Sequence, residues 1–309
     1  MNQCVISDPL FILAPPRSLT SVVCAMLGQH PQMYGLPETH LFSAAFIGEW
    51  WDLCERSNFE MADGLLRAIA ELYFGEQTET TVRRAVGWLR RRAHYTTGYL
   101  LEILANRVHP HILVEASPSM ASDLGILERA YSMFPDAKFI HLVQHPRGYG
   151  EAVIEAINDA KVHGPVPQWL LQLASYSNLT TNSEPSISWR VLHLNISEFL
   201  KSIHRDQKML IRAEDLFAEP SPGLKRIAAW MGLRTDDDAV ESMKHPEQSV
   251  YACFGPQNAV YGNDAFFLKD PALRPKQACY SLDGPLSWRH DGQGFLPEVK
   301  DFAQQFGYE

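Results

Sequence analysis

Short apolar runs along this chain are separated by longer stretches in which apolar residues recur every three or four positions. The runs are typical of strands buried on both faces, and the longer stretches are typical of helices with one apolar side. Strands that alternate with helices predict an α/β fold, with a mostly parallel sheet flanked by helices and joined by right-handed crossovers. The predicted strands cover residues 9–14, 111–115, 138–143 and 208–212, and the predicted helices cover residues 22–28, 122–134, 220–231 and 297–305.

The stretch from residue 40 to residue 108 has a helical pattern throughout. It contains a basic cluster, Arg83–Arg84 and Arg90–Arg92, which we interpret as a solvated helix face. A docking site for an acidic partner surface is the alternative interpretation of the same cluster. No change in composition divides the chain, so we expect residues 1–309 to form a single domain.

Composition and charge exclude several classes of function. The chain has 309 residues and a formal net charge of −9, and broad nucleic-acid binding would instead need a basic face that neutralises phosphates. The five cysteines lack the paired spacing of a disulfide framework or a zinc site, and the histidines show no metal-ligand spacing. No secretory signal and no apolar run of membrane-spanning length is present. We therefore expect a cytoplasmic protein without a metal and without a membrane or nucleic-acid partner.

The loop after the first predicted strand has the composition of an anion site. In an open parallel sheet, ligands bind beyond the carboxyl ends of the strands, and segments 15–21, 116–120 and 144–149 all lie there. In the first segment Arg17 offers a guanidinium fork and three residues offer hydroxyls, just before a helix N-terminus that favours negative charge. The sequence therefore predicts one crevice with an anion cradle in the first strand-to-helix turn. The three hydroxyl residues are Ser18, Thr20 and Ser21.

The order of several motifs resembles that of the sulfotransferase family over nearly the whole chain. Arg17-Ser18-x-Thr20-Ser21 is similar to the family's 5′-phosphosulfate loop, and the segment 139–146 is similar to its strand and turn "IHLVRHP". The subgroup that the chain resembles most is that of the polyketide-associated sulfotransferases, which sulfonate a hydroxyacyl chain on a carrier protein. Further matching segments are His30-Pro31, Leu36–Leu41, Ser117–Ser119, Glu214–Leu216 with Pro220, and Leu286–Trp288 with Pro297 and Phe306–Tyr308.

This resemblance implies a P-loop-type α/β fold with a helical acceptor side, and a donor, 3′-phosphoadenosine 5′-phosphosulfate (PAPS), that is used without a metal. The implied acceptor is a hydroxyl on a small natural product or on an acyl chain bound to an acyl-carrier protein. Glu38 stands at the position of the family's catalytic carboxylate, and His40 is the second candidate base or a partner of Glu38. The implied donor-binding residues are Arg17, Ser18, Leu19, Thr20, Ser21, Gln144 and Arg147.

Four positions depart from the family pattern, and all of them belong to the expected donor crevice. Leu19 stands where the family has a glycine, and Ala116 stands where it has a lysine. Gln144 and Ala152 stand where the family has an arginine and a serine that bind the 3′-phosphate. A charge-assisted hydrogen bond contributes about 1.5–3 kcal/mol, so the loss of two cations would weaken donor binding strongly unless Arg147 replaces one of them.

These departures leave two alternatives open beside a PAPS-dependent enzyme. One is an enzyme on the same scaffold that no longer uses PAPS and performs acid–base chemistry on a biosynthetic intermediate with Glu38 and His40. The other is a non-catalytic module that binds a carrier protein or a nucleotide through the basic cluster.

Overall fold

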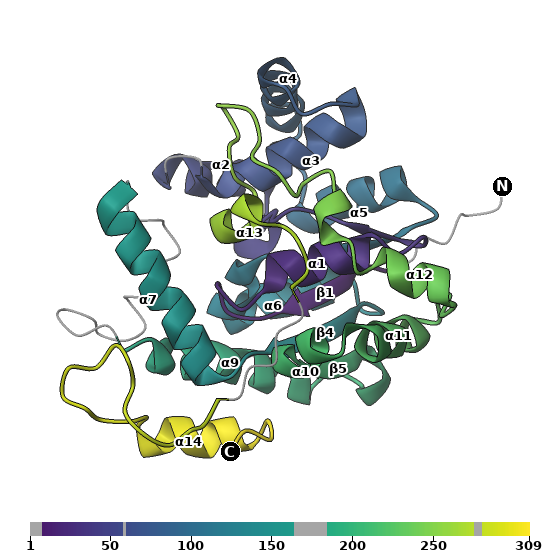
Figure 1. Cartoon of the computed structure of the whole chain (residues 1–309). Helices are drawn as coiled ribbons and strands as arrows, with labels where there is room; N and C mark the ends of the chain where they lie inside the picture. The colour runs from purple at the N-terminus through teal and green to yellow at the C-terminus, as the bar shows by residue number, and fades with distance from the viewer. Residues whose placement is uncertain (1–7, 58–59, 164–183, 275–279) are drawn as a thin grey trace.

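A computed structural model describes residues 8–57, 60–163, 184–274 and 280–309 of the chain. Its centre is a parallel five-stranded sheet in the order β2-β3-β1-β4-β5 (Figure 1). The strands are β1 (Leu10–Leu13), β2 (Met33–Gly35), β3 (Ile112–Glu115), β4 (Lys138–Val143) and β5 (Lys208–Arg212). The predicted α/β class and parallel sheet are confirmed, and four of these strands lie within one or two residues of their predicted bounds.

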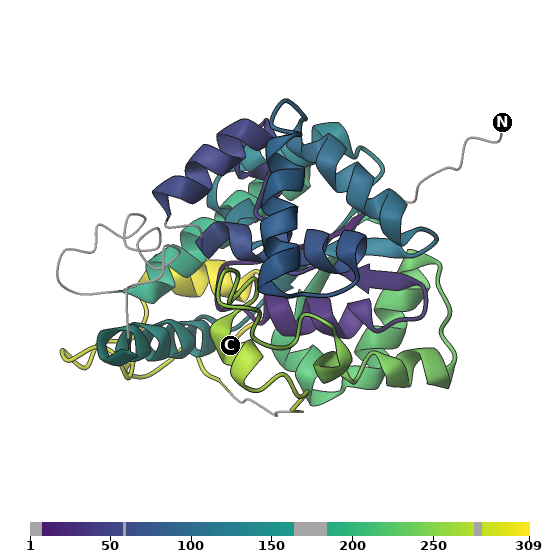
Figure 2. The same cartoon turned by 90° about the horizontal axis from the view of Figure 1, so that it is seen from above.

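Helices cover both faces of the sheet, and the long helix α7 lies at one side of the molecule in both views (Figures 1 and 2). The helices are α1 (Thr20–Gly28), α2 (Ile47–Arg56), α3 (Asp63–Phe74), α4 (Glu79–Arg90), α5 (Thr97–Val108), α6 (Leu124–Met133), α7 (Pro146–His163), α9 (Pro185–Lys201), α10 (Ala213–Ala218), α11 (Pro220–Met231), α12 (Asp237–Ser242), α13 (Ala265–Lys269) and α14 (Pro297–Gln304). Short 3₁₀ turns cover Leu41–Ser43, Glu60–Ala62, Pro118–Ser122, Arg205–Gln207 and Pro246–Gln248.

Strand β1 shows how the sheet separates two cores. Leu10 and Ile12 pack on one face with α1 and α11, whereas Phe11 and Leu13 pack on the other face with α3, α5 and α6. Successive side chains of a strand point to opposite faces, so a strand covered on both faces must be apolar at every position. The uninterrupted apolar run at residues 9–14 has this origin.

Strand β2 was not predicted from the sequence. It has three residues, and it pairs in parallel with β3 through Met33↔Ile112 and Gly35↔Val114. A strand of this length and composition carries almost no periodic signal, and its place at the edge of the sheet depends on a partner 79 residues away along the chain (112 − 33).

Candidate active site

The first strand-to-helix turn is wound tightly by two residues with left-handed backbones. Arg17 has φ +67° and Leu19 has φ +64°, a region that costs a residue other than glycine about 1–2 kcal/mol. Leu19 therefore takes the conformation for which a glycine is suited, and its side chain is 38% exposed. The replacement of glycine by leucine keeps the shape of the turn at the expense of backbone strain.

Unused hydrogen-bond donors remain in this turn. Ser18 is fully buried, and its hydroxyl has no hydrogen-bond partner among the described residues. Thr20 begins α1 and is buried, and no side chain caps the start of this helix. The first N–H groups of a helix have no partner within the helix, and they carry partial positive charge. Ser18 and the start of α1 therefore offer an anion a set of donors for which the described part of the chain supplies no other acceptor.

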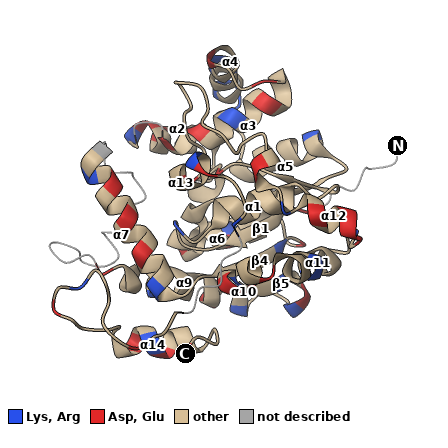
Figure 3. Cartoon of the chain, viewed as in Figure 1, with Lys and Arg blue, Asp and Glu red and all other residues tan. Residues whose placement is uncertain are grey.

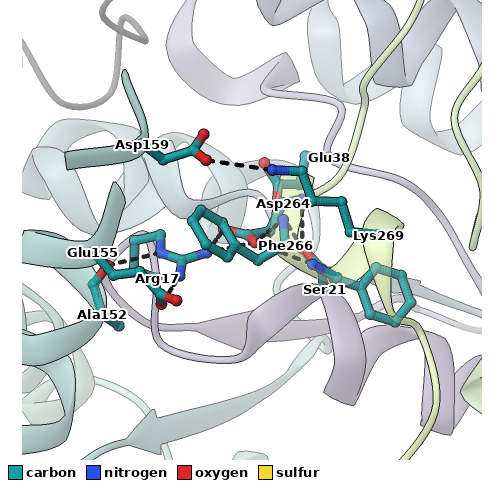
Figure 4. Close-up of polar contacts among 10 residues, drawn as sticks. Arg17, Ser21, Glu38, Ala152, Glu155, Asp159, Asp264, Phe266 and Lys269 are labelled. Carbon is teal, nitrogen blue, oxygen red and sulfur yellow. Dashed lines mark hydrogen bonds and ion pairs between the residues drawn. The ribbon is translucent and has the colours of Figure 1, made fainter. Parts of the chain in front are cut away.

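Arg17 already holds a carboxylate, which Figure 4 shows. Its Nη1 lies 2.5 and 2.6 Å from the two carboxylate oxygens of Asp264, and its Nη2 lies 3.6 Å from Glu155. The guanidinium also lies over the ring of Phe266, 4.1 Å from the centroid, and its Nε donates to the carbonyl of Ala152. Because the side chain is only 8% exposed, Arg17 faces this cluster and not bulk solvent.

Glu38 joins the turn through Ser21. The hydroxyl of Ser21 donates to Oε1 of Glu38 over 2.9 Å, and it accepts the backbone N–H of Asp264 over 3.0 Å. Burial raises the pKa of Glu38 to about 8, the negative charge of Asp264 adds to this rise, and the Ser21 hydrogen bond opposes it. A carboxyl with such a pKa is poised to gain or lose a proton near neutral pH, directly beside the anion cradle.

His40 lies beside Glu38 and is neutral at neutral pH. Its Nε2 is 3.7 Å from Oε2 of Glu38, its Nδ1 is 3.0 Å from the hydroxyl of Ser119, and its backbone is left-handed with φ +51°. Burial lowers the pKa of His40 to about 4, so the imidazole carries no charge above this pH. At 3.7 Å it makes no direct hydrogen bond to the carboxyl.

Glu115 supports the loop that carries both candidates, and sequence reasoning missed it. It ends strand β3, is almost fully buried, and accepts hydrogen bonds from the Thr39 hydroxyl and from the backbone N–H and hydroxyl of Ser117. Ser117 in turn accepts the backbone N–H of His40 over 2.8 Å. The sequence feature that could have identified Glu115 is an acidic residue at the carboxyl end of an apolar strand.

Asp264 is the second residue that sequence reasoning missed. It precedes α13 and accepts the N–H groups of Phe266 and Phe267. Farther along α13, Lys269 pairs with Asp159 of α7 over 3.5 Å. An isolated aspartate ahead of a five-residue helix gives no sequence signal that it contacts Arg17.

The predicted donor residues after β4 are placed less favourably for an anion. Gln144 is 9% exposed, and its Oε1 has no partner among the described residues. Arg147 donates from all three guanidinium nitrogens to the backbone carbonyls of Ser281, Asp283 and Pro285, at 2.7 to 3.1 Å. Arg147 therefore ties the segment 281–285 to α7.

The loop that carries Glu38 packs so closely against α3 that a side chain at Gly64 would not fit between them. A Cβ on Gly64 would lie 2.0 Å from the carbonyl oxygen of Glu38, and the backbone N–H of Glu38 donates to Gly262 over 2.7 Å. We expect Gly64→Ala to destabilise the fold by about 1–3 kcal/mol and to lower activity, because the backbone of Glu38 must move. Thermal unfolding and activity assays measure both effects.

Gly87→Ala in α4 is the matched control for this prediction. Its Cβ would meet only the flexible Arg91 side chain at 3.6 Å, so the helix is expected to gain about 0.5–1 kcal/mol from the lower backbone entropy of alanine. Equal stability of the two variants would contradict the close approach at Gly64.

Among the residues that the structure describes, no group of three or more histidine, cysteine or acidic side chains could hold a metal ion. Within the same part of the chain, no helix combines the length and the apolar character that crossing a membrane requires.

Comparisons with known proteins agree with the fold. The model of the family described as "Sulfotransferase family" matches residues 9–237. The structure is similar to the sulfotransferase domain from the curacin biosynthetic pathway, with a TM-score of 0.74, 22% identity and 98% coverage of both chains. It is also similar to the sulfotransferase domain from the Synechococcus PCC 7002 olefin synthase, with a TM-score of 0.70, 24% identity and coverage of 98% and 95%. No curated protein sequence matches the chain.

Proposed function

Because the chain belongs to the sulfotransferase family, we propose that it transfers a sulfonate group from PAPS to a hydroxyl of a small natural product or of a carrier-bound acyl chain. The observation that carries this proposal is the contact between Ser21, in the first turn of α1, and Glu38. It joins an anion-binding turn to a carboxyl whose pKa is about 8, and sulfonate transfer to a hydroxyl needs these two elements side by side.

The residues of the turn fit the phosphosulfate end of such a donor. The buried hydroxyl of Ser18 lacks a partner, the start of α1 is uncapped, and Arg17 can bind an anion once it releases Asp264. At the 3′ end the fit is poorer, since Gln144 offers a neutral amide and Arg147 is engaged by three carbonyls. When bound, PAPS would supply the sulfonate and a nucleotide leaving group.

Glu38 is the proposed base. Its carboxylate form takes the proton of the acceptor hydroxyl, and the Ser21 hydrogen bond fixes its orientation at the mouth of the turn. Neutral His40 lies on the other side of the carboxyl and adds no positive charge of its own that would lower the pKa of Glu38. Ser18, the N–H groups of α1 and Arg17 stabilise the negative charge that develops on the leaving phosphate.

Mass spectrometry of a 3-hydroxyacyl pantetheine thioester tests the proposal. We expect a sulfonated product when PAPS is added and unchanged thioester when it is omitted. Adenosine 5′-phosphosulfate, which lacks the 3′-phosphate, is the comparison donor for the neutral Gln144 site. Absence of sulfonated product with both donors would contradict the proposal.

A second function is favoured by the contacts that already engage two predicted donor residues, an ion pair for Arg17 and backbone carbonyls for Arg147. Arg17 holds Asp264, and the cation expected to replace the missing arginine at position 144 is bound to the segment 281–285. An enzyme that uses Glu38 and His40 for acid–base chemistry without PAPS would suit this arrangement. Conversion of the thioester in the absence of any nucleotide would favour it over sulfonate transfer.

A further inference from the structure

One surface beside the candidate site combines exposed arginines with exposed apolar side chains. We define this arginine–aromatic surface as Phe46, Arg90, Arg91, Tyr99 and Met133. Phe46 is 44% exposed, Tyr99 is 46% exposed and Met133 is 38% exposed. Arginine, aromatic residues and methionine are enriched in protein interfaces relative to the rest of a protein's surface. The composition therefore differs from that of an ordinary solvated helix face.

Backbone contacts hold this surface together. The N–H of Ile47, next to Phe46, donates to Tyr95 over 2.9 Å, and Phe46 forms an isolated bridge with Thr96. Tyr99 lies in the first turn of α5, and its ring is 5.0 Å from that of Tyr95.

Met133 and Arg90 join the same surface from other helices. Met133, the last residue of α6, packs against Gly98, the neighbour of Tyr99. The guanidinium of Arg90 lies over the ring of Trp51, 5.5 Å from its centroid. These contacts thus link residues that lie in, or next to, the helices α2, α4, α5 and α6.

Arg90 and Arg91 bring two exposed positive charges to this surface. Neither arginine forms an ion pair with any described residue, although the chain as a whole carries a net charge of −9. Glu49 and Glu55 of α2 accept hydrogen bonds from neighbouring N–H groups, Glu49 from the backbone of Ala45 and Phe46 and Glu55 from the indole of Trp51.

Arg83 and Arg84 lie on the same helix α4, where Arg83 pairs with Glu79 over 3.4 Å, whereas α12 carries red bands in Figure 3. Opposite charges on two protein surfaces steer their encounter and select the partner.

Helix α2 connects this surface to the candidate base. Its buried Trp50 donates the indole N–H to the carbonyl of His40 over 3.1 Å, while Phe46, just before the helix, faces solvent. A partner seated on the outer side would therefore lie across α2 from the loop of Glu38 and His40. A flexible arm on that partner could deliver a tethered hydroxyl to the site.

From these observations we infer that the arginine–aromatic surface binds an acidic carrier protein and brings its tethered acyl chain to Glu38. This inference rests on the proposed function, because it chooses the carrier-bound acceptor over the free small molecule. The carboxylates of the carrier protein would pair with Arg90 and Arg91, and its apolar residues would cover Phe46, Tyr99 and Met133.

The test uses an acidic acyl-carrier protein that bears a 3-hydroxyacyl group on its phosphopantetheine. Its affinity for the full chain is measured by calorimetry at low and at high salt, and it is expected to fall as salt rises. The double variant R90E/R91E is expected to bind at least about 10-fold more weakly, because two attractive charges become repulsive. The control K201E/R205E reverses two exposed charges elsewhere and is expected to bind as the wild-type chain does.

Kinetics separates this inference from the proposed function. R90E/R91E is expected to lower kcat/KM for the carrier-bound acceptor and to leave the pantetheine-bound acceptor unaffected. Undiminished carrier binding by R90E/R91E, or binding of the wild-type chain to anionic vesicles or DNA but not to the carrier protein, would overturn the docking inference. Carrier binding that depends on Arg90 and Arg91 without any sulfonated product would support the docking inference and contradict only the proposed function.

Discussion

Glu38→Gln is expected to lower the rate of sulfonate transfer by about 10²–10⁴-fold, the usual contribution of a general base. Glutamine has the shape of glutamate and can still accept the hydrogen bond of the Ser21 hydroxyl, so the turn should keep its structure. What the variant loses is the ability to take a proton from the acceptor. Steady-state kinetics with saturating donor measures the effect.

The pH dependence gives this prediction a second readout. Since only the carboxylate form is a base, wild-type activity should rise with pH and level off above about 8, the pKa of Glu38. The raised pKa also means that the folded chain binds a proton more tightly than the unfolded chain. This contribution to stability is present at low pH, and it is lost as the pH rises to about 8. Glu38→Gln should abolish both dependences.

Glu298→Gln, an exposed carboxylate in α14, is the control and should leave activity and both pH profiles unchanged. Undiminished activity of Glu38→Gln would refute the assignment of the base. Carrier binding by the wild-type chain without any turnover would instead favour the non-catalytic module.

Arg17→Met is expected to weaken the binding of adenosine 3′,5′-bisphosphate, the product nucleotide, by about 10- to 100-fold. One charge-assisted hydrogen bond contributes about 1.5–3 kcal/mol, and 1.4 kcal/mol corresponds to a factor of about ten in affinity. The variant also leaves Asp264 without its cation, so thermal stability should fall. Calorimetric titration of the nucleotide and thermal unfolding measure the two effects.

Asp264→Asn is the companion variant, and it separates the effect on nucleotide affinity from the effect on thermal stability. It removes the carboxylate that competes for the guanidinium, so nucleotide affinity should increase although an ion pair is lost. Arg274→Met, which breaks an exposed pair with Asp270, is the control and should change neither quantity appreciably. Weaker nucleotide binding by Asp264→Asn would show that the Arg17–Asp264 pair shapes the site and does not compete with the donor.

Local patterns in the sequence predicted the parts of the fold whose cause is local. The apolar run of β1 reflects burial on both faces, and the helix predicted at residues 220–231 coincides with α11. That helix begins at Pro220 and is followed by Gly232, whose φ is +74°. Proline at the start and glycine after the end of a helix are effects of a few neighbouring residues, which explains why such bounds can be read from the sequence.

Periodicity and strand polarity depend on neighbouring residues, and they were sufficient to predict the α/β class, the parallel sheet and the position of the first strand-to-helix turn. The partners of the charged side chains, in contrast, follow from the packing of distant segments. Arg17 meets Asp264, which is 247 positions away, and Arg147 meets carbonyls more than 130 positions away. A pairing of this kind depends on how helices and loops pack around the sheet, and no short stretch of sequence contains that information. The raised pKa of Glu38 has the same origin, since burial and the charge of Asp264 both come from distant segments.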